Sequence, residues 1–488
     1  MSKRTPAWRS PGGIIGLGLS LATPLLVSAC STLERQGMSG AVETPAPPAP
    51  KPPVSDTAER KKLVAMFGGE YRWPRAENYL NEVLGKLARV SDTPSQPYRV
   101  TILNSGAINA FALPSGDLFV TRGLLALAND TAEIAAVMAH EIGHVTARHA
   151  FLRAEQEKTA QVITRAATVI QSRHKGEQVE TSSALSLAGF SRQQELEADR
   201  IGIRAAARAG YDPFGAARFL NSLERASELR DQATGQKSDK PDLLSTHPST
   251  PERISAALGE ARQIGAPGIG DAARGAYLAA IDGMTFGDDP KDGAIVGRRF
   301  VHPRLGFTFE APEGFTLENS HSAVLGVANG GAEALRLDSV RAPAGKPLAE
   351  YLTSGWIDGL LASTIESGQV NGLSAVFADA RAGEWNFRVA VIAYRDDLYR
   401  IIFAVKALTP EAQQQFAASF ASFRALAPEE VKLSTALRLR VVVAGAKDTE
   451  ATLEGRMAID HPAEQFHTLN ALGDAGVKPG DSYKIIAN

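Results

Sequence analysis

Two histidines, His140 and His144, stand four residues apart in the stretch AAVMAHEIGHVTARHA and restrict the geometry of any helix that contains them. Residues i and i+4 of an α-helix lie one above the other on one face, so both imidazoles can reach a single tetrahedral metal ion. Glu141 lies about 100° around such a helix, where its carboxylate can flank the ion and take a proton from bound water. The pattern predicts a metal site; the alternative is a capped amphipathic helix with two structural histidines.

The residues around these histidines carry the start signal and the apolar side of a buried helix. Asp130 is a good N-cap, and Glu133 three residues later gives a capping-box-like start. The apolar side consists of Ile134, Val137, Met138, Ile142 and Val145. We therefore expect the two histidines to lie on a helix packed inside the protein body.

A catalytic zinc ion also needs a third protein ligand and an open fourth position. The candidate lies in GFSRQQELEADRIG, which is again predicted to be helical. Glu195 and Asp199 are four residues apart and share a face, whereas Glu197 points about 200° away from Glu195. If Glu195 binds metal, Asp199 can accept the N–H of a ligand histidine and fix its tautomer. Taken alone, the segment favours a charged helix face on which arginines pair with these acids.

The remaining histidines are expected to be structural. His149 lies about 180° around a continuous helix from His140, so it cannot join the same ion. Five others have no partner at ligand spacing, and surface or turn positions suffice for them: His174, His302, His321, His461 and His467.

Together, the two helical segments resemble the HtpX-like and CAAX-prenyl-protease-like metalloendopeptidases, which pair HExxH with a later ExxxD. SRQQELEAD (191–199) resembles the SRxxExxAD of that family, and STHPSTPERI (245–254) resembles its HPxxxxR element. NAFALPSGDLFVTRGLL (109–125) is similar to the stretch that forms an edge strand at the cleft. The likeness is closest to the soluble periplasmic members, because residues 59–262 lack long apolar spans.

The resemblance implies a zincin-type fold that holds one zinc ion (Zn2+) per chain. It implies His140, His144 and Glu195 as the ligands and Glu141 as the general base. Asp199 is implied to lie behind the ligands and to orient a histidine.

The resemblance also implies residues that act on the substrate. His247 would either stabilise the oxyanion or occupy the open position of the metal as an inhibitory plug, with Arg253 assisting nearby. An extended peptide would add a strand along an edge through backbone hydrogen bonds, so unfolded chains would be favoured as substrates. The residues of this edge are Asn109, Ala110, Phe111 and Ala112.

The amino-terminal segment is typical of a lipoprotein signal peptide. A basic start precedes an apolar run at 14–27, which is too short to span a bilayer but suits a secretory signal. VSAC resembles a bacterial lipobox that ends at Cys30, the lone cysteine of the chain; the alternative is an ordinary cleaved signal. Ser31 points to the outer membrane in that family of signals. We expect a lipid anchor at Cys30 and a periplasmic protein body.

Composition and pattern predict a multi-domain α+β protein. Of the 488 residues, 44% are hydrophobic and 22% charged, as in soluble globular proteins. After the signal peptide at 1–30, residues 31–58 form a proline-rich linker. Residues 59–262 are predicted to be a mostly helical metalloprotease domain, with a small hairpin-like sheet within 98–125. Residues 263–290 are predicted to be a second linker.

Two further parts follow. Residues 291–428 are predicted to form an antiparallel α+β sandwich of unknown role that faintly resembles the PsbP/Mog1-like sandwiches, with helices near 347–364 and 409–423. Residues 433–488 resemble a separate LysM module, although Lys447 stands where LysM modules usually carry glycine. Peptidoglycan is therefore a candidate partner.

Two functions remain open. The formal net charge of −2 gives no reason to expect nucleic acid as a partner. The first function is a metalloendopeptidase of the cell envelope that cleaves unfolded or misassembled envelope proteins. The second is a non-catalytic, lipid-anchored scaffold or chaperone whose structural metal is closed by His247 as fourth ligand. Glu141 favours the first, because a structural site needs no base.

Overall fold

The computed structural model describes residues 57–153, 190–234, 247, 249–320, 322–343, 345–473 and 476–488. The expected signal peptide, the lipidation site Cys30, almost all of the proline-rich linker, His174 and His321 lie outside these residues. Within the described ranges, no helix has the length and apolarity needed to cross a membrane.

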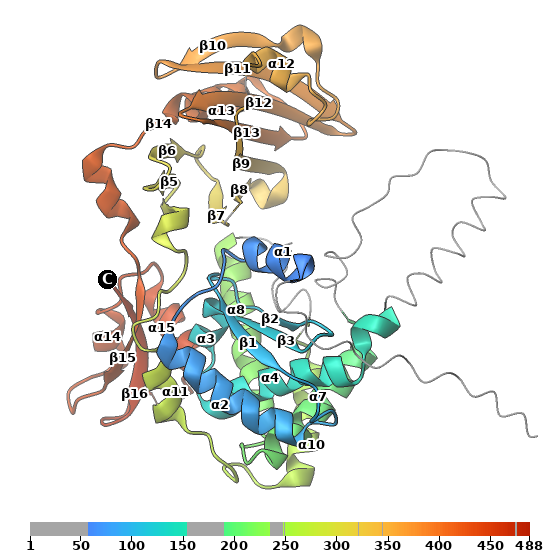
Figure 1. Ribbon diagram of the computed structural model, residues 1–488. Helices are drawn as coiled ribbons and strands as arrows, with labels where there is room; N and C mark the ends of the chain where they lie inside the picture. The colour runs from blue at the N-terminus through green and yellow to red at the C-terminus, as the bar shows by residue number, and fades with distance from the viewer. Residues whose placement is uncertain are drawn as a thin grey trace, which may run out of the picture. The chain divides into compact units, whose positions relative to one another are not determined.

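Helices surround a small sheet in the part of the chain that holds the HExxH segment (Figure 1). The helices are α1 (Ala58–Met66), α2 (Pro74–Val90), α3 (Arg122–Leu127), α4 (Thr131–Thr146), α7 (Arg192–Arg208), α8 (Gly215–Thr234), α10 (Pro251–Ile264) and α11 (Arg274–Ile281). The strands are β1 (Arg99–Leu103), β2 (Ala110–Ala112) and β3 (Asp117–Thr121).

Helix α4 is the buried centre of this body. Every residue from Thr131 to His144 is buried, and the helix contacts α2, α7, α8 and strand β2. Its N-cap is Asp130, as expected, with Oδ1 accepting the N–H of Glu133 at 2.9 Å. The Glu133 side chain reaches one residue further back than a capping box would, and accepts the N–H of Asn129 at 2.9 Å.

The small sheet has the strand order β1-β3-β2. β2 and β3 form the antiparallel hairpin that the alternation predicts, whereas β1 runs parallel to β3. β2 has β3 as its one partner among the described strands, so it is an edge strand next to α4.

Residues 291–428 form an antiparallel α+β structure, as predicted. A seven-stranded sheet has the order β10-β11-β12-β13-β9-β8-β7, and a four-stranded sheet has the order β14-β6-β5-β4. Phenylalanines fill the core, where Phe403 and Phe416 stack at 4.2 Å. The strands are β4 (Ala294–Val296), β5 (Arg299–His302), β6 (Phe307–Glu310), β7 (Thr316–Asn319), β8 (Ala323–Ala328), β9 (Glu333–Arg341), β10 (Glu366–Val370), β11 (Leu373–Ala382), β12 (Trp385–Tyr394), β13 (Asp397–Val405) and β14 (Arg424–Ala425).

Helical turns complete this part. The α-helices lie close to the two predicted positions, at α12 (Leu348–Leu352) and α13 (Pro410–Ser422), although α12 is much shorter than predicted. Four 3₁₀ segments are η1 (Pro290–Asp292), η2 (Asn329–Gly331), η3 (Ala362–Thr364) and η4 (Pro428–Ser434).

The last residues form a two-stranded antiparallel sheet with two helices between its strands. The order is β15 (Arg438–Val443), α14 (Glu450–Glu454), α15 (Pro462–Asn470) and β16 (Ser482–Ala487). One face of this sheet packs on its own helices through Tyr483 and Ile485. The other face joins the core of the HExxH body through Leu439 and Ile486. The expectation of a separate module is therefore wrong, while its likeness to LysM stays a prediction.

A buried lysine reinforces this attachment. Lys484 is fully buried, and its Nζ donates to the carbonyls of Ala126, Leu127 and Ala128 at 2.7, 3.1 and 2.8 Å. These carbonyls end helix α3, where a helix leaves acceptors without intrahelical partners. The chain thus joins its last strand to the segment that leads into α4.

The expected linker at 263–290 also needs correction. It contains α11, whose Tyr277 and Leu278 are buried in the same core. Its glycine and alanine content suggests a loop, but the apolar face of α11 packs against α2 and α4.

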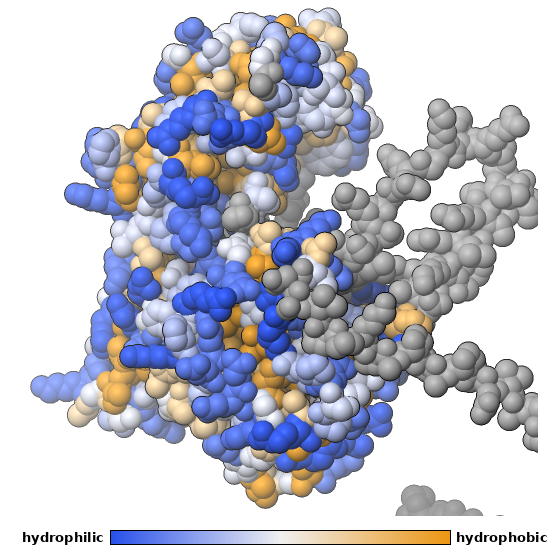
Figure 2. All heavy atoms as spheres, in the orientation of Figure 1, coloured by the Kyte–Doolittle hydropathy of each residue, from blue (hydrophilic) through white to orange (hydrophobic). Residues whose placement is uncertain are grey.

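On the face drawn in Figure 2, hydrophilic side chains are spread with smaller apolar areas between them, as on most protein surfaces.

Candidate metal centre

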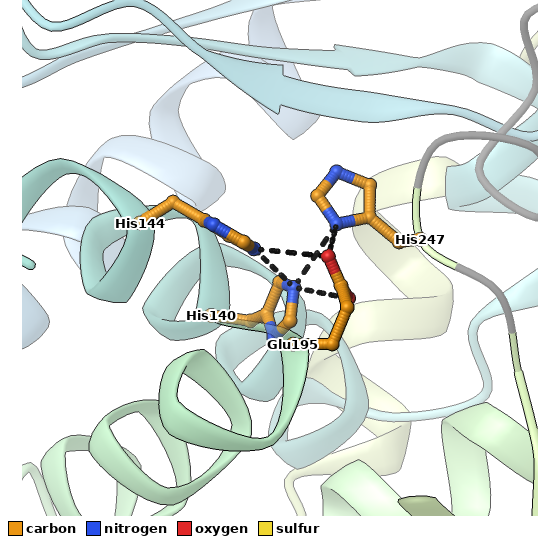
Figure 3. A group of neighbouring side chains, drawn as sticks. All are labelled: His140, His144, Glu195 and His247. Atoms are coloured by element: carbon orange, nitrogen blue, oxygen red, sulfur yellow. Dashed lines mark hydrogen bonds and ion pairs between the residues drawn. The ribbon is translucent and has the colours of Figure 1, made fainter. Parts of the chain in front are cut away.

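Four buried side chains from three segments point toward one another (Figure 3). His140 and His144 come from α4, Glu195 comes from the first turn of α7, and His247 precedes α10. One donor atom from each lies within 4.8 Å of all the others. The structure therefore brings together the three predicted ligands and the histidine predicted to act beside them.

The spacing of these donor atoms fits a tetrahedral ion. The Nε2 atoms of His140 and His144 are 3.0 Å apart, and Nδ1 of His247 lies 3.3 Å from His140 Nε2. Glu195 oxygens lie 3.5 Å from each of the two α4 imidazoles. Zinc bonds of about 2.0–2.1 Å in a tetrahedron place neighbouring donors about 3.3–3.4 Å apart. The residues therefore fit zinc in both number and type.

Glycines let the two ligand-bearing helices approach closely. A Cβ built on Gly202 of α7 would lie 2.8 Å from the backbone nitrogen of His140. One built on Gly143 of α4 would lie 3.1 Å from the carbonyl oxygen of Ala198. Gly202 has no room for a side chain, and a Cβ at Gly143 would require its neighbours to move by a few tenths of an ångström. Glu195 therefore reaches the histidines across a tight helix–helix contact.

Asp199 lies behind His140, on the side away from the donor cluster. Its Oδ1 lies 2.9 Å from Nδ1 of His140, which leaves Nε2 to face the donor cluster. Burial by itself lowers the pKa of His140, but the carboxylates of Asp199 and Glu195 outweigh it and raise this pKa to about 10. The metal-free site therefore binds a proton on His140, and a metal ion has to displace it.

Arg253 is occupied by the ligand network. Its Nε and Nη2 donate to the two oxygens of Asp199 at 2.8 Å each, and its Nη1 donates to the carbonyl of His247 at 3.1 Å. The same Nη1 lies 2.9 Å from Glu195 Oε2. These contacts suit a residue that positions its neighbours, and a direct part for Arg253 in catalysis stays a prediction.

The ionisation of the other two ligands suits metal binding. Burial opposes the charge on Glu195, but His247 and His140 hold the pKa of its carboxyl far below the usual range. Burial, together with the neighbouring His140 and His247, lowers the pKa of His144 well below its ordinary value. A carboxylate and a neutral imidazole are the ligand forms that zinc requires.

Glu141 is buried beside the cluster without being part of it. Its Oε1 lies 3.7 Å from Nε2 of His247, and this oxygen has no hydrogen-bond partner among the described residues. A buried carboxylate oxygen without a partner is costly unless something else binds there. A water at the metal would satisfy it, which is the arrangement that a general base needs.

His149 lies against the site, contrary to its expected remote position. Helix α4 ends at Thr146, and Arg148 adopts a left-handed conformation with φ of 56° that turns the chain back. Nδ1 of His149 consequently lies 2.9 Å from Nδ1 of His144. The helical projection does not give this contact, because it assumes a continuous helix.

Phe190 is a second neighbour that the sequence did not reveal. Its ring stacks on the His144 imidazole with centroids 4.0 Å apart and planes inclined by 24°. The guanidinium of Arg153 lies over the ring of Phe190, 4.7 Å from the centroid of that ring. A phenylalanine before an N-capping serine gives no signal of such a role, since its contact is made across the fold.

The predicted substrate edge has the required backbone geometry. The N–H of Thr121 donates to the carbonyl of Asn109, and the N–H of Leu113 donates to that of Asp117. Since hydrogen-bonded pairs alternate along an antiparallel ladder, Ala110 and Ala112 direct their backbone groups to the free side of β2. The Phe111 side chain is buried. Peptide binding at Asn109–Ala112 stays a prediction.

One of the histidines expected to lack partners also has acidic neighbours. Nε2 of His467 lies 3.1 Å from Glu450 and 3.8 Å from Glu454. The donor atoms of these three residues are close enough for an ion, but the group is partly exposed. Surface ion pairs of this kind are common and contribute little.

A family model and curated relatives are similar to parts of this chain. The model of peptidase family M48 matches residues 74–261. The beta-barrel assembly-enhancing protease of Escherichia coli (strain K12) is 30% identical over 216 residues, which are 42% of this chain and 43% of that protein. The mitochondrial metalloendopeptidase OMA1 of Arabidopsis thaliana is 32% identical over 213 residues, 41% of each chain. This chain thus covers less than half the length of either relative.

A comparison with solved structures gives a weak likeness. The cyanobacterial PsbP from Synechocystis sp. PCC 6803 covers 27% of this chain and 98% of its own, with 15% identity and a TM-score of 0.22. A score this low carries no argument, so the PsbP-like interpretation of residues 291–428 stays a prediction.

Proposed function

Because the model of peptidase family M48 matches residues 74–261, we propose that this chain is a zinc-dependent metalloendopeptidase. The observation that carries the proposal is the group His140, His144 and Glu195 at tetrahedral spacing, with the free oxygen of Glu141 beside it. Two imidazoles and one carboxylate form the ligand set of a catalytic zinc rather than a closed structural one.

In the proposed mechanism, bound zinc supplies Lewis-acid activation of a water molecule and of the scissile carbonyl. His140, His144 and Glu195 hold the ion, and Asp199 keeps the Nδ1 proton of His140 away from it. Glu141 takes a proton from the water on its free Oε1 and delivers it to the leaving amine. The buried setting keeps this carboxylate away from bulk water and strengthens its interactions.

The substrate in this proposal is an extended segment of an unfolded or misassembled envelope protein. The segment pairs with the free backbone groups of Ala110 and Ala112 on edge strand β2. Recognition through backbone hydrogen bonds gives loose sequence preference and excludes folded chains, whose strands are already paired. A Cys30 lipid anchor would hold the protein at the periplasmic face of the outer membrane, and the LysM-like part would contact peptidoglycan.

His247 is proposed to regulate this site as a plug. Its Nδ1 lies 3.0 Å from Glu195 Oε1 and 3.3 Å from His140 Nε2, at the distances of a fourth ligand. The alternative role as oxyanion donor makes the opposite prediction. Under the plug proposal, His247→Ala raises the rate of casein cleavage; a lower rate supports the oxyanion role.

The second candidate function is a non-catalytic scaffold with a structural zinc. The observation in its favour is that four protein donors surround one point, as in closed sites. Under this alternative, His247→Ala yields no proteolysis even though zinc stays bound.

The decisive experiment measures zinc content and casein cleavage together, with and without a chelator. Wild type is expected to bind one zinc per chain and to lose activity with the chelator. Glu141→Gln is expected to keep its zinc and to lose cleavage by about 10²–10⁴-fold, the usual value of a general base. A Glu141→Gln variant that cleaves at the wild-type rate would refute the assignment of the base.

A further inference from the structure

Both ligand histidines of α4 are oriented in the same way. Each directs Nε2 into the donor cluster and Nδ1 away from it. An imidazole that binds metal through Nε2 carries its proton on Nδ1, so that nitrogen needs an acceptor. For His140, Oδ1 of Asp199 lies 2.9 Å from that nitrogen. For His144, the atom at hydrogen-bonding distance is Nδ1 of His149.

From this contact we infer that His149 is a positioning residue for His144. It is the counterpart of Asp199, and it accepts the Nδ1 proton of His144 so that Nε2 stays free for the metal. The inference rests on the proposed zinc function. It assigns to His149 the tautomer with a proton on Nε2 and a lone pair on Nδ1.

The surroundings of His149 favour that tautomer. Its Nε2 lies 3.5 Å from Oε2 of Glu197, a carboxylate that accepts but does not donate. Glu197, which faces away from the metal in helical projection, thus contacts the site through His149. The result is two parallel chains of contact: Arg253 to Asp199 to His140, and Glu197 to His149 to His144.

The backbone supports the same role. Arg148 holds the left-handed conformation that brings His149 back onto α4, although non-glycine residues disfavour it. His149 is itself buried, at 1% exposure. Phe190 stacks on the His144 ring and fixes its plane, while the contact with His149 fixes its rotation in that plane. A neutral acceptor orients this ligand without adding a second negative charge behind the metal.

The test compares two substitutions at one position. In His149→Asn the amide oxygen falls near the place of Nδ1 and can still accept from His144, whereas His149→Leu removes the acceptor. The zinc dissociation constant of the full purified chain is measured by competition with a chelating indicator. Unfolding of the metal-free proteins by urea is measured in parallel. We expect His149→Leu to bind zinc about 10–100-fold more weakly than wild type and His149→Asn within about threefold of it.

The outcomes separate the two proposals. A wild-type chain that binds no zinc overturns the proposed function itself. A wild-type chain that binds zinc, with a His149→Leu variant that binds equally well, overturns only the role of His149. Equal weakening in the Leu and Asn variants also overturns it, since loss of packing would then explain both. If His149→Leu does not fold, His149→Gln replaces it, because its amide oxygen reaches the place of Nε2 and points away from His144.

Discussion

At the scale of single residues, Glu133 shows how burial alters the pKa of a carboxyl on the helix that carries the HExxH segment. This carboxyl is 1% exposed on the first turn of α4. Burial, followed by the charge of Asp130, raises its pKa from the ordinary 4.5 to about 7. A raised pKa in the folded state stabilises the fold below pH 4.5, and this stabilisation is lost as the pH rises through 7.

We therefore predict that Glu133→Gln flattens the pH dependence of stability. The free energy of unfolding of wild type, relative to that of the variant, should fall by up to about 3 kcal/mol between pH 4.5 and 8. Urea unfolding at several pH values measures it. Glu82→Gln, at an exposed position on α2, is the matched control and should follow wild type. Parallel pH curves for wild type and Glu133→Gln would contradict the prediction.

Which site residues could be predicted depends on whether regular geometry connects them. His140 with His144, and Glu195 with Asp199, share a face by helical periodicity, so the sequence alone pairs them. His149 was beyond this reasoning, because its position depends on the left-handed turn at Arg148 after the helix ends. No residue type at that turn announces it, since glycine is the usual signal.

At the scale of elements, the contact between α4 and α7 positions Glu195 against the two histidines. Gly202 stands where an added Cβ would meet the backbone of His140 at 2.8 Å, so the contact has no space for a methyl group. Gly259 of α10 has nothing within 4 Å of its added Cβ. The two glycines therefore offer a matched comparison of packing and helix propensity.

Gly202→Ala is predicted to push the ligand helices apart. We expect it to lower the free energy of unfolding by about 1–3 kcal/mol and to weaken zinc binding. Gly259→Ala should instead stabilise the protein by about 0.5–1 kcal/mol, because alanine favours a helix over glycine. Thermal unfolding and zinc titration of both variants check this. Similar stability of the two would show that the helices can separate without cost.

Whether a segment is a helix or a strand was easier to predict than which other elements it pairs with or packs against. The alternation of residues 98–125 predicts the β2–β3 hairpin, whose strands are adjacent in sequence, but it does not predict that β1 pairs in parallel with β3. Helix α11 was missed because a short segment rich in small residues has little apolar periodicity. Its burial of Tyr277 is set by distant helices.

At the scale of the whole molecule, the sheet of β15 and β16 is covered on both faces. Tyr483 and Ile485 face its own helices, whereas Lys484 and Ile486 face the HExxH body. Period-2 alternation normally distinguishes a buried face from a solvent face, and β16 lacks it because four consecutive residues are buried. The sequence of a short strand that is buried on both faces does not show which other elements it packs against.

Ile486→Ala is therefore predicted to destabilise the HExxH body as well as the C-terminal sheet. Ile486 is 0% exposed, so the loss should be about 2–4 kcal/mol, with casein cleavage falling at lower temperature than in wild type. Val443→Ala in the neighbouring strand is the control, since Val443 is 65% exposed and should change stability by less than about 0.5 kcal/mol. Unchanged thermal inactivation in Ile486→Ala would mean that the sheet is an independent unit.

The position of Lys484 also bears on the order in which the molecule is assembled. The ribosome makes the HExxH segment long before the strand that carries this lysine. The carbonyls at the end of α3 therefore lack the Lys484 ammonium group until that strand has been made. The core around the donor cluster is therefore complete only once β16 has been made and has packed against it. Under the proposed function, this order would delay cleavage until the metal centre has its full support.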